Sequence, residues 1–463
     1  MSTQQHYDAI VIGSGQAGTP LCTALAGAGL RTALIEREHV GGTCINEGCT
    51  PTKTMVASGR VAYLARRGAD YGVHTGDIRI DMERVRQRKR DIVTSFRSGS
   101  QTRIENTRNL DLLFGEASYT GSKSVAVTLR SGGRAELTAD RYFLNTGARP
   151  SVPKLDGLSD IPFLNSTSIM ELGAVPEHLL ILGGGYIGLE FGQMFRRFGS
   201  QVTVVQMGAQ LLSREDPDVA QEIAKILEQD GITVHLNANA KRISKGAGGI
   251  RLEVEQLGHG FSISGSHLLV ATGRTPNSEM LNLDAAGVKT DKRGFIEVNE
   301  RLESSAPGIF ALGDVKGGPA FTHISYDDYR IIRTNVIDRG NASTEGRLVP
   351  YTVFIDPQLG RIGMTEMEAR TQKRNYRVAR MPMSSVARAL EVDEARGFMK
   401  ALVDAGSGQI LGAAVLGIEG GEIMAMLQLA MMGRLPFPVL REAIFAHPTL
   451  AESLNNLFTH FEA

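Results

Sequence analysis

Two cysteines in the stretch GGTCINEGCTPTK (residues 41–53) have the residue type and spacing for redox chemistry. Cys44 and Cys49 are five positions apart, and in an ideal helix such residues lie roughly 8–9 Å from each other. A disulfide requires Cα atoms about 4.4–6.8 Å apart. Closing the pair therefore requires a distorted backbone, which Gly48 and Pro51 permit. Such a disulfide is strained and easily reduced, and strained disulfides are more often catalytic than structural.

The alternative for the pair is a metal site or simple packing. A structural zinc site takes about four ligands, and the only other cysteine of the chain, Cys22, lies in PLCTALAGAGL, which reads as a buried first helix. No second cysteine pair completes a zinc site, so we expect no metal.

A dinucleotide-binding motif precedes the cysteines. The strand-like run YDAIVI leads into Gly13, Gly15 and Gly18, which are placed for a tight turn, for close approach to a pyrophosphate and for close helix–strand packing. The free N–H groups at the start of the following helix favour a pyrophosphate. A second strand, RTALIE, ends at Glu36, whose carboxylate suits a ribose diol. The alternative is a glycine-rich turn in an unrelated βαβ unit.

The same pattern recurs later in the chain. LLIL leads into Gly183, Gly185 and Gly188, and QVTVVQ ends at Gln206. Glu36 lies 36 − 13 = 23 residues after its first glycine, and Gln206 lies 206 − 183 = 23 after its own. The second motif therefore ends on a neutral amide, which neither holds a 2′-hydroxyl as a carboxylate would nor repels a 2′-phosphate. Arg214 is a candidate phosphate partner, and the choice between NADH and NADPH stays open.

Three further loops follow strand-like runs: NTGARP (145–150), ATGRTPN (271–277) and IFALGD, which ends at Asp314. Asp314 suits hydrogen bonds from the ribityl chain of a flavin, although an ordinary turn aspartate is the alternative. Two dinucleotide motifs and a cysteine pair in one chain indicate an electron relay, from a nicotinamide through a flavin to the disulfide.

Length and composition limit the other functions. The 463 residues favour about three domains, and Lys+Arg and Asp+Glu both number 50, so no net charge attracts nucleic acid or acidic membranes. The basic run RVRQRKR (84–90) is expected to be a solvated helix face, and the methionines of EIMAMLQLAMM to pack in a core or subunit interface. We see no signal peptide at the start and no apolar run long enough for a membrane span, which favours a cytoplasmic protein.

The motifs GGTCINEGCTPTK, GGGYIGLE, ATGRTPN, ALGD and AHPTLAE, in that order, resemble the class I pyridine nucleotide–disulfide oxidoreductases. That family includes dihydrolipoamide dehydrogenase, glutathione reductase and mercuric reductase, and the resemblance covers essentially the whole chain. It implies an α/β fold with two Rossmann-like domains, for FAD and NAD(P)H, plus a C-terminal α+β dimerisation domain. The implied ranges are 1–150 and 276–345 for a split FAD domain, 151–275 for the NAD(P) domain and 346–463 for the dimerisation domain.

The resemblance also assigns roles to individual residues. Cys49 would be the charge-transfer thiol beside the flavin, and Cys44 the interchange thiol that attacks the substrate. Lys53 would lie beside the flavin N5 and pair with Glu190, for which two solvated helix charges are the alternative. Tyr186 would cover the nicotinamide pocket. The further nucleotide-binding positions that we assign in these motifs are Gly42, Thr43, Thr146, Gly147, Gly273, Arg274 and Gly313.

His447 and Glu452 of AHPTLAE would come from the partner subunit of a homodimer and face the interchange cysteine. A thiol needs a base to become a nucleophile, and a leaving thiolate needs a proton. An imidazole exchanges protons near neutral pH, and a carboxylate can hold its tautomer. A histidine before proline would otherwise be a structural residue. If the pair is catalytic, each active site needs two chains and a monomer is inactive.

Three segments resemble one branch of the family, the bacterial reactive-chlorine-resistance flavoproteins that act as hypothiocyanous acid reductases: ALGDVKGGPAFTHISYDDYRII, VPYTVFIDPQLGRIGMTE and IFAHPTLAESLNNLF. This resemblance implies NAD(P)H-dependent reduction of a small oxidant, HOSCN, in oxidative-stress defence. Attack by Cys44 would give a sulfenyl thiocyanate, which Cys49 would resolve to the disulfide.

Other members of the family fit less well. Mercuric reductases resemble the chain at SREDPDV but use a C-terminal cysteine pair, as high-molecular-weight thioredoxin reductases do, and LNNLFTHFEA has no cysteine. Dihydrolipoamide dehydrogenases carry an acid at the Gln206 position, and glutathione reductases use arginines just beyond it. A general disulfide reductase acting on lipoamide or a small disulfide stays an alternative. A non-catalytic NAD(P)H sensor is a further one, against which the intact set of Cys44, Cys49, Lys53, His447 and Glu452 argues.

Overall fold

The computed structural model describes residues 5–246 and 249–462, and the chain divides into two compact units. Unit 1 comprises Met1–Thr54, Arg84–Ser151 and Gly273–Arg347. Unit 2 comprises Met55–Glu83, Val152–Thr272 and Leu348–Ala463. The domain boundaries predicted from the sequence stay predictions. Residues 1–4, which begin the N-terminal stretch in which no signal peptide is predicted, lie outside the described residues.

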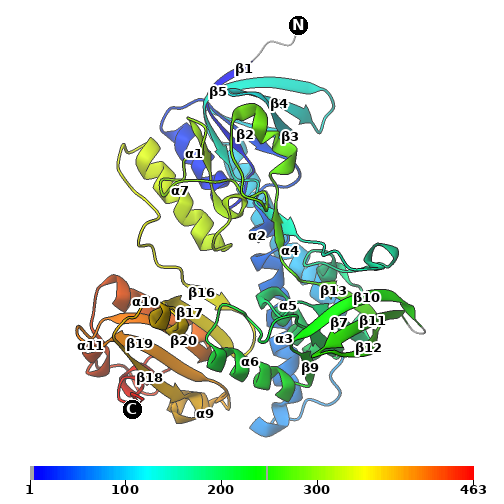
Figure 1. The fold of residues 1–463 in the computed structure, drawn as a ribbon, viewed down its shortest axis with the longest axis vertical. Helices are drawn as coiled ribbons and strands as arrows, with labels where there is room; N and C mark the ends of the chain where they lie inside the picture. The colour runs from blue at the N-terminus through cyan, green and yellow to red at the C-terminus, as the bar shows by residue number, and fades with distance from the viewer. Residues whose placement is uncertain (1–4, 247–248, 463) are drawn as a thin grey trace. The chain divides into compact units, whose positions relative to one another are not determined.

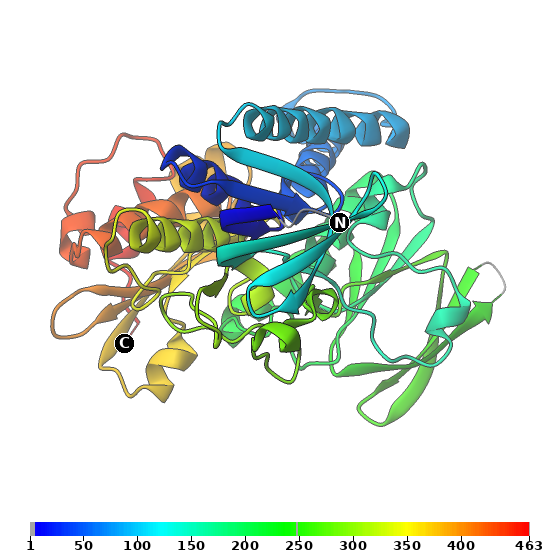
Figure 2. The same cartoon turned by 90° about the horizontal axis from the view of Figure 1, so that it is seen from above.

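Unit 1 is built on one six-stranded sheet (Figures 1 and 2). Its parallel strands follow the order β15 (Ile309–Ala311), β5 (Arg134–Leu144), β1 (Gln5–Ile12), β2 (Thr32–Glu36) and β3 (Leu110–Gly121). The sixth strand, β4 (Ser124–Leu129), pairs antiparallel with both β3 and β5. The strand-like runs that flank the first glycine motif are thus confirmed as the neighbouring strands β1 and β2.

The sheet of unit 1 is buried on both faces along the second half of its central strand, because apolar side chains occupy β1 from Ala9 to Ile12. Along β1, Ile10 and Ile12 enter one core cluster, while Ala9 and Val11 enter another. This alternation follows from the two-residue repeat of a strand. Helices α1 (Gly18–Gly27) and α7 (Thr322–Val336) pack side by side on the second face, and both supply residues to its core (Figures 1 and 2).

The first helix buries Cys22 completely, as predicted. The remaining elements of unit 1, including two helices that extend beyond it, are α2 (Gly42–Asn46), α3 (Cys49–Arg66), α4 (Met82–Glu105) and the two-stranded pair β6 (Ala148–Pro150) and β14 (Arg274–Pro276). The basic run lies on α4 as expected, but it is not wholly a solvated face, because Lys89 is buried. Across residues 5–246 and 249–462, no helix combines the length and apolar composition needed to cross a membrane.

Unit 2 begins with a second parallel sheet, in the order β13 (His267–Val270), β7 (His178–Leu182), β8 (Gln201–Val205) and β9 (Ile232–His235). Helix α5 (Tyr186–Phe198) packs on β7 and β8, and α6 (Pro217–Gln229) packs on β9. An antiparallel sheet follows, made of β10 (Ala238–Gly246), β11 (Gly249–Gln256) and β12 (His259–Gly265). The second glycine motif therefore also lies between a parallel strand and a helix, as predicted.

The C-terminal part of unit 2 is an antiparallel sheet covered by helices (Figure 1). Its strands follow the order β16 (Tyr351–Val353), β17 (Gln358–Gly363), β20 (Ile410–Gly417), β19 (Phe398–Asp404) and β18 (Tyr376–Pro382). Helix α10 (Gly420–Met432), which carries the predicted methionine-rich run, packs on β17 and β20. The other helices here are α8 (Glu366–Thr371), α9 (Ala387–Glu391), α11 (Phe437–Arg441) and α12 (Ser453–Leu457).

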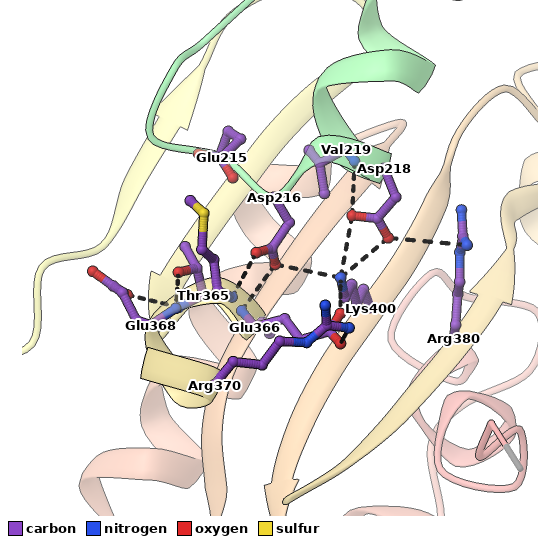
Figure 3. A network of polar contacts seen from close by, with 12 residues as sticks. Glu215, Asp216, Asp218, Val219, Thr365, Glu366, Glu368, Arg370, Arg380 and Lys400 are labelled. Atoms are coloured by element: carbon purple, nitrogen blue, oxygen red, sulfur yellow. Dashed lines mark hydrogen bonds and ion pairs between the residues drawn. The ribbon is translucent and has the colours of Figure 1, made fainter. Parts of the chain in front are cut away.

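A buried lysine joins the nucleotide-binding part of unit 2 to its C-terminal sheet (Figure 3). Lys400 of β19 is 2% exposed, and its Nζ lies 2.7 Å from Glu366, 3.1 Å from Asp218 and 3.3 Å from Asp216. Burial lowers the pKa of Lys400, but the surrounding carboxylates outweigh burial and raise it. Asp216 also accepts hydrogen bonds of 3.0 Å from the N–H groups of Glu366 and Met367, so it caps α8.

We expect Lys400→Met to lower the free energy of unfolding by about 3 kcal/mol, because three carboxylates lose their shared buried cation. Urea unfolding followed by circular dichroism measures the change. The matched control is Lys225→Met, which removes an exposed ion pair with Glu222 and should change stability by no more than about 0.5 kcal/mol. Equal losses in the two variants would contradict the role given to the Lys400 network.

Candidate active site

The first glycine turn connects β1 to α1 in unit 1. Gly13 has a φ of +97°, and a Cβ there would lie 2.3 Å from the carbonyl oxygen of Asn145. A Cβ on Gly18 would lie 2.1 Å from the carbonyl oxygen of Gly13, and one on Gly42 would lie 2.7 Å from the Cα of Gly15. Side chains therefore cannot enter this turn. The resulting backbone cradle at the N-terminus of α1 fits the pyrophosphate of a dinucleotide.

Glu36 ends β2 beside this turn, as its spacing predicts. Its Oε2 accepts hydrogen bonds from the Ser14 N–H at 3.0 Å and from the Ser14 hydroxyl at 2.6 Å. Its Oε1 accepts one from the N–H of Glu38 at 2.8 Å. These contacts hold the carboxylate at the rim of the cradle, where it suits a ribose diol.

Asn145, which the sequence reading did not single out, joins three segments of this site. The residue is buried, and its Oδ1 accepts a 2.8 Å hydrogen bond from the N–H of Gly18. Its Nδ2 donates to the carbonyl of Leu312 at 2.9 Å. Asn145 stands in the NTGARP loop that the sequence did flag, but its partners lie 127 and 167 residues away. No local pattern could have identified them.

The predicted strand-end loops meet at one side of unit 1. The N–H of Asn277 donates to Gly147 at 3.0 Å, and the hydroxyl of Thr146 donates to the carbonyl of Asn277 at 2.7 Å. The N–H of Ser151 donates to Gly273 at 2.9 Å. The pairing of β6 with β14 thus brings the NTGARP and ATGRTPN loops together.

Asp314 lies beside these loops in the segment that follows β15. Its carboxylate lies 3.8 Å from Nε of Arg274, and Nη2 of the same arginine donates to the carbonyl of Ala148. Burial raises the pKa of Asp314, although Arg274 and Lys316 oppose the rise. The neighbouring Gly313 donates its N–H to the fully buried Asp328 at 2.8 Å. This arrangement leaves a half-buried carboxyl group next to the cradle.

The second glycine turn, in unit 2, repeats the geometry of the first. Gly183 has a φ of +106°, and a Cβ there would lie 2.5 Å from the carbonyl oxygen of Ala271. A Cβ on Gly188 would lie 2.3 Å from the carbonyl oxygen of Gly183. A Cβ on Gly185 would meet nothing within 4 Å, so this glycine borders open space at the start of α5. Space bordered by backbone at a helix N-terminus fits a second pyrophosphate.

Two predicted nucleotide residues flank this second turn. Tyr186 is the first residue of α5. Gln206 follows β8, and its Oε1 accepts a 2.8 Å hydrogen bond from the N–H of Gly184. The second site therefore has the glycine turn, the helix and the strand-end side chain that the repeated spacing predicts.

The two cysteines lie on either side of a break between helices. Helix α2 ends at Asn46 and α3 begins at Cys49. The backbone folds back at Gly48 toward Cys44. A Cβ on Gly48 would lie only 3.3 Å from the Cα of Cys44. All three cysteines of the chain carry thiols in this structure. The distorted backbone predicted for the pair is confirmed: Gly48 lies at the break, whereas Pro51 lies in the first turn of α3.

Thr322, at the start of α7, contacts the thiol pair and was missed by the sequence reading. Its hydroxyl lies 3.4 Å from Sγ of Cys49. The Cys49 side chain, followed by burial, raises the pKa of the Cys44 thiol, whereas the Thr322 hydroxyl lowers it. Thr322 precedes His323 in an ordinary-looking THIS segment, so only the contact across 273 residues reveals it.

Lys53 and Glu190 lie in different units. Lys53 lies on α3, one helical turn after Cys49. Glu190 lies on α5, is 3% exposed, and accepts a 2.9 Å hydrogen bond from the N–H of Phe354. A solvated charge at Glu190 is thereby excluded, whereas the pairing of Lys53 with Glu190 stays a prediction.

His447 and Glu452 contact each other in the C-terminal part of unit 2. Nδ1 of His447 lies 2.8 Å from Oε2 and 3.1 Å from Oε1 of Glu452. The histidine side chain is 67% exposed. The carboxylate engages Nδ1, so Nε2 is the nitrogen that can exchange a proton with another group.

Together, these features define a class of protein that carries two dinucleotide turns and a redox-capable thiol pair beside the first. Across residues 5–246 and 249–462, no three His, Cys, Asp or Glu side chains are placed to hold a metal ion. The two dinucleotide turns and the thiol pair supply the groups for electron transfer between nucleotides and thiols.

Comparison with known proteins identifies the family. Residues 7–328 match the pyridine nucleotide-disulphide oxidoreductase family, and residues 349–458 match the dimerisation domain of that family. The chain belongs to the pyridine nucleotide-disulphide oxidoreductases. It is accordingly a flavoprotein that uses FAD and NAD(P)H and acts on a sulfur group.

Two relatives and one solved structure are similar to this chain over almost its whole length. The chain is 39% identical to the probable pyridine nucleotide-disulfide oxidoreductase RclA of Escherichia coli (strain K12), over 98% of this chain and 99% of RclA. It is 33% identical to the mercuric reductase of Bacillus cereus, over 97% of this chain and 70% of that enzyme. The fold matches the Cu(II) complex of the HOCl-induced flavoprotein disulfide reductase RclA from Escherichia coli, with a TM-score of 0.89 and 38% identity over 98% of this chain and 99% of that one.

We expect Thr322→Val to raise the pH at which the reduced protein forms a thiolate. The valine keeps the shape but removes a hydroxyl donor next to Cys49, and losing such a donor disfavours the charged form by about one pH unit. The measurement is a pH titration of the long-wavelength absorbance that a thiolate stacked on oxidised flavin produces. Thr322→Ser should restore the midpoint, and an unchanged midpoint in the valine variant would rule out this contact.

Proposed function

We propose that this flavoprotein reduces a small sulfenyl-type oxidant, hypothiocyanous acid, with electrons from NAD(P)H. The observation that carries the proposal is the thiol pair at the Gly48 break, where Cys44 is half-buried and Cys49 is exposed. A small oxidant needs no docking surface to reach such a pair. The likeness to an HOCl-induced disulfide reductase supports a role in defence against oxidants.

Bound NAD(P)H and FAD would supply the electron pair that returns the Cys44–Cys49 disulfide to two thiols. Glu36, Gly42 and Asp314 would hold FAD in unit 1, together with the backbone of the first glycine turn. Gly185, Tyr186 and Gln206 would hold the nicotinamide nucleotide in unit 2.

The chemistry at sulfur follows from where protons reside in the pair. The Cys49 side chain and burial raise the pKa of Cys44, so in this proposal Cys44 would keep its proton and Cys49 would be the thiolate. His447 would take the proton from Cys44, whose sulfur then attacks the sulfur of HOSCN and displaces hydroxide. The imidazolium returns the proton, which gives water. Cys49 then attacks Cys44, a disulfide forms, and thiocyanate leaves.

The proposed enzyme is a homodimer whose active sites contain residues of both chains. The match to a dimerisation domain supports the dimer, and so does an apolar surface in the C-terminal region. In that region Leu429 and Met432 of α10 are 66% and 64% exposed, and Ile444, three residues before His447, is 102% exposed. Water-exposed apolar side chains of this size mark interaction surfaces. A second copy seated there would bury them and bring its own His447 to this region.

We infer a cytoplasmic location as well. The cycle requires a thiol pair that is repeatedly reduced, and cytoplasmic conditions keep thiols reduced.

The acceptor is tested by oxidation of NADPH and NADH with HOSCN, lipoamide, glutathione disulfide, Hg(II) and Cu(II). We expect kcat/KM for HOSCN to exceed the other values at least about a hundredfold, or about 2.7 kcal/mol of transition-state discrimination. Preference for lipoamide or glutathione disulfide would make the protein a general disulfide reductase instead. Cys44→Ser should keep FAD but lose all turnover, and retained turnover would remove Cys44 from the chemistry.

The shared site is tested by mixing inactive subunits. Cys44→Ser and His447→Gln dimers should each be nearly inactive. If each site takes its thiols from one chain and its histidine from the other, a mixed dimer has one intact site of two, and random reassembly restores about a quarter of wild-type activity. Mixed dimers of Cys44→Ser with Cys49→Ser lack an intact thiol pair in every site and serve as the control. No recovery in the first mixture would place His447 in the site of its own chain.

A further inference from the structure

Each glycine turn has an equivalent hydrogen bond, donated by the backbone N–H that follows its first glycine. The side chain that accepts this bond differs between the two turns. At the first turn, Glu36 Oε2 accepts from the N–H of Ser14 at 3.0 Å. At the second, Gln206 Oε1 accepts from the N–H of Gly184 at 2.8 Å. Ser14 and Gly184 each follow the first glycine of their motif, so Gln206 occupies the place of Glu36. The carboxylate of one site is replaced by an amide in the other.

The orientation of this amide follows from its two backbone partners. Nε2 of Gln206 donates to the carbonyl of Gln210 at 3.2 Å, while Oε1 faces the N–H of Gly184. The reversed amide would set donor against donor and acceptor against acceptor, so only one orientation satisfies both groups. One N–H and one lone pair of Gln206 stay available to a ligand. The side chain can therefore donate and accept, and it carries no charge.

The loop after Gln206 is held at both ends. The N–H of Leu212 donates to Gly184 at 2.9 Å, and Nε2 of Gln210 donates to the carbonyl of Glu215 at 2.9 Å. The Glu215 side chain, which is 1% exposed, accepts from the hydroxyl of Tyr351 and lies 3.4 Å from Nε of Arg361. These hydrogen bonds hold the loop in place before a nucleotide binds, which lowers the cost of ordering it on binding.

Glu215, which holds the far end of this loop, is next to a residue of the network around Lys400. Asp216, the residue after Glu215, caps α8 and contacts Lys400 (Figure 3). Arg214 directly precedes Glu215 and is exposed, and it lies close enough to Tyr351 to lower the pKa of that phenol, which burial raises. Arg214 is the only Lys or Arg in residues 206–215.

We infer that Gln206 makes the second site accept both NADH and NADPH, with Arg214 as the cation that meets the 2′-phosphate. A carboxylate at this place would favour the 2′-hydroxyl of NADH and repel the 2′-phosphate of NADPH. The amide donates to either group and repels neither. The inference rests on the proposed use of the second turn for the reducing nucleotide, and it names the donor rather than the oxidant.

The test measures binding of the adenosine half of each nucleotide to the FAD-loaded dimer by calorimetry, with ADP-ribose and 2′-phospho-ADP-ribose as the probes. We expect the two wild-type Kd values to agree within about tenfold. Gln206→Glu should weaken 2′-phospho-ADP-ribose at least about tenfold and leave ADP-ribose within about threefold. Arg214→Ala should weaken only the phosphorylated probe, by about threefold or more.

The control is Lys225→Met, which removes the same charge from the exposed face of α6 and should leave both affinities unchanged. In Gln206→Glu, the new carboxylate oxygen faces the carbonyl of Gln210, which can disturb the site. If Gln206→Glu binds neither probe, the Arg214→Ala result decides the test. A wild-type difference above about a hundredfold, or variants that keep the wild-type ratio of affinities, would overturn the inference. Because no oxidant is present, failure of the HOSCN assay leaves this result intact.

Discussion

A steric constraint that appears twice underlies the whole molecule: the first glycine of each nucleotide motif lies against the carbonyl oxygen of a neighbouring strand end. At Gly13 that oxygen belongs to Asn145, and at Gly183 it belongs to Ala271. Because a Cβ would have to lie 2.3 Å and 2.5 Å from these oxygens, any other residue would push the two strand ends apart. The helix that follows each glycine would then lose its place. Pyrophosphate binding therefore depends on contacts that no side chain makes.

The features predicted from the sequence are those that a short stretch contains in full. A glycine motif, the strand before it and the helix after it lie within about 30 residues, so the strand and helix on either side of Gly13 and Gly183 were foreseeable. The pairing of His447 with Glu452 is equally local, since the residues are five apart. Gly48 was also foreseeable as the residue that permits the break between Cys44 and Cys49.

The features that were missed depend on contacts between distant parts of the chain. Asn145 looks like any loop asparagine, and Thr322 like any helix-starting threonine, until the fold places one against Gly18 and the other against Cys49. Lys89 shows that the sequence can also predict the wrong environment. As part of a basic run it was expected to lie in solvent, but the fold buries it. Pattern and propensity describe neighbours in sequence, whereas these roles depend on neighbours in space.

The protonation of the thiol pair explains why the proposed contribution of a histidine from a second chain would be useful. Cys49 and burial both raise the pKa of Cys44, so the sulfur proposed to attack the oxidant is the one that keeps its proton. A cation placed permanently beside Cys44 would remove that difference and leave both sulfurs charged and mutually repelling. A base that acts only when substrate arrives avoids this, because it removes the proton at the moment of attack and returns it to the leaving group. In the proposed cycle, Glu452 would prepare His447 for that exchange by engaging Nδ1, which leaves Nε2 for the proton transfer.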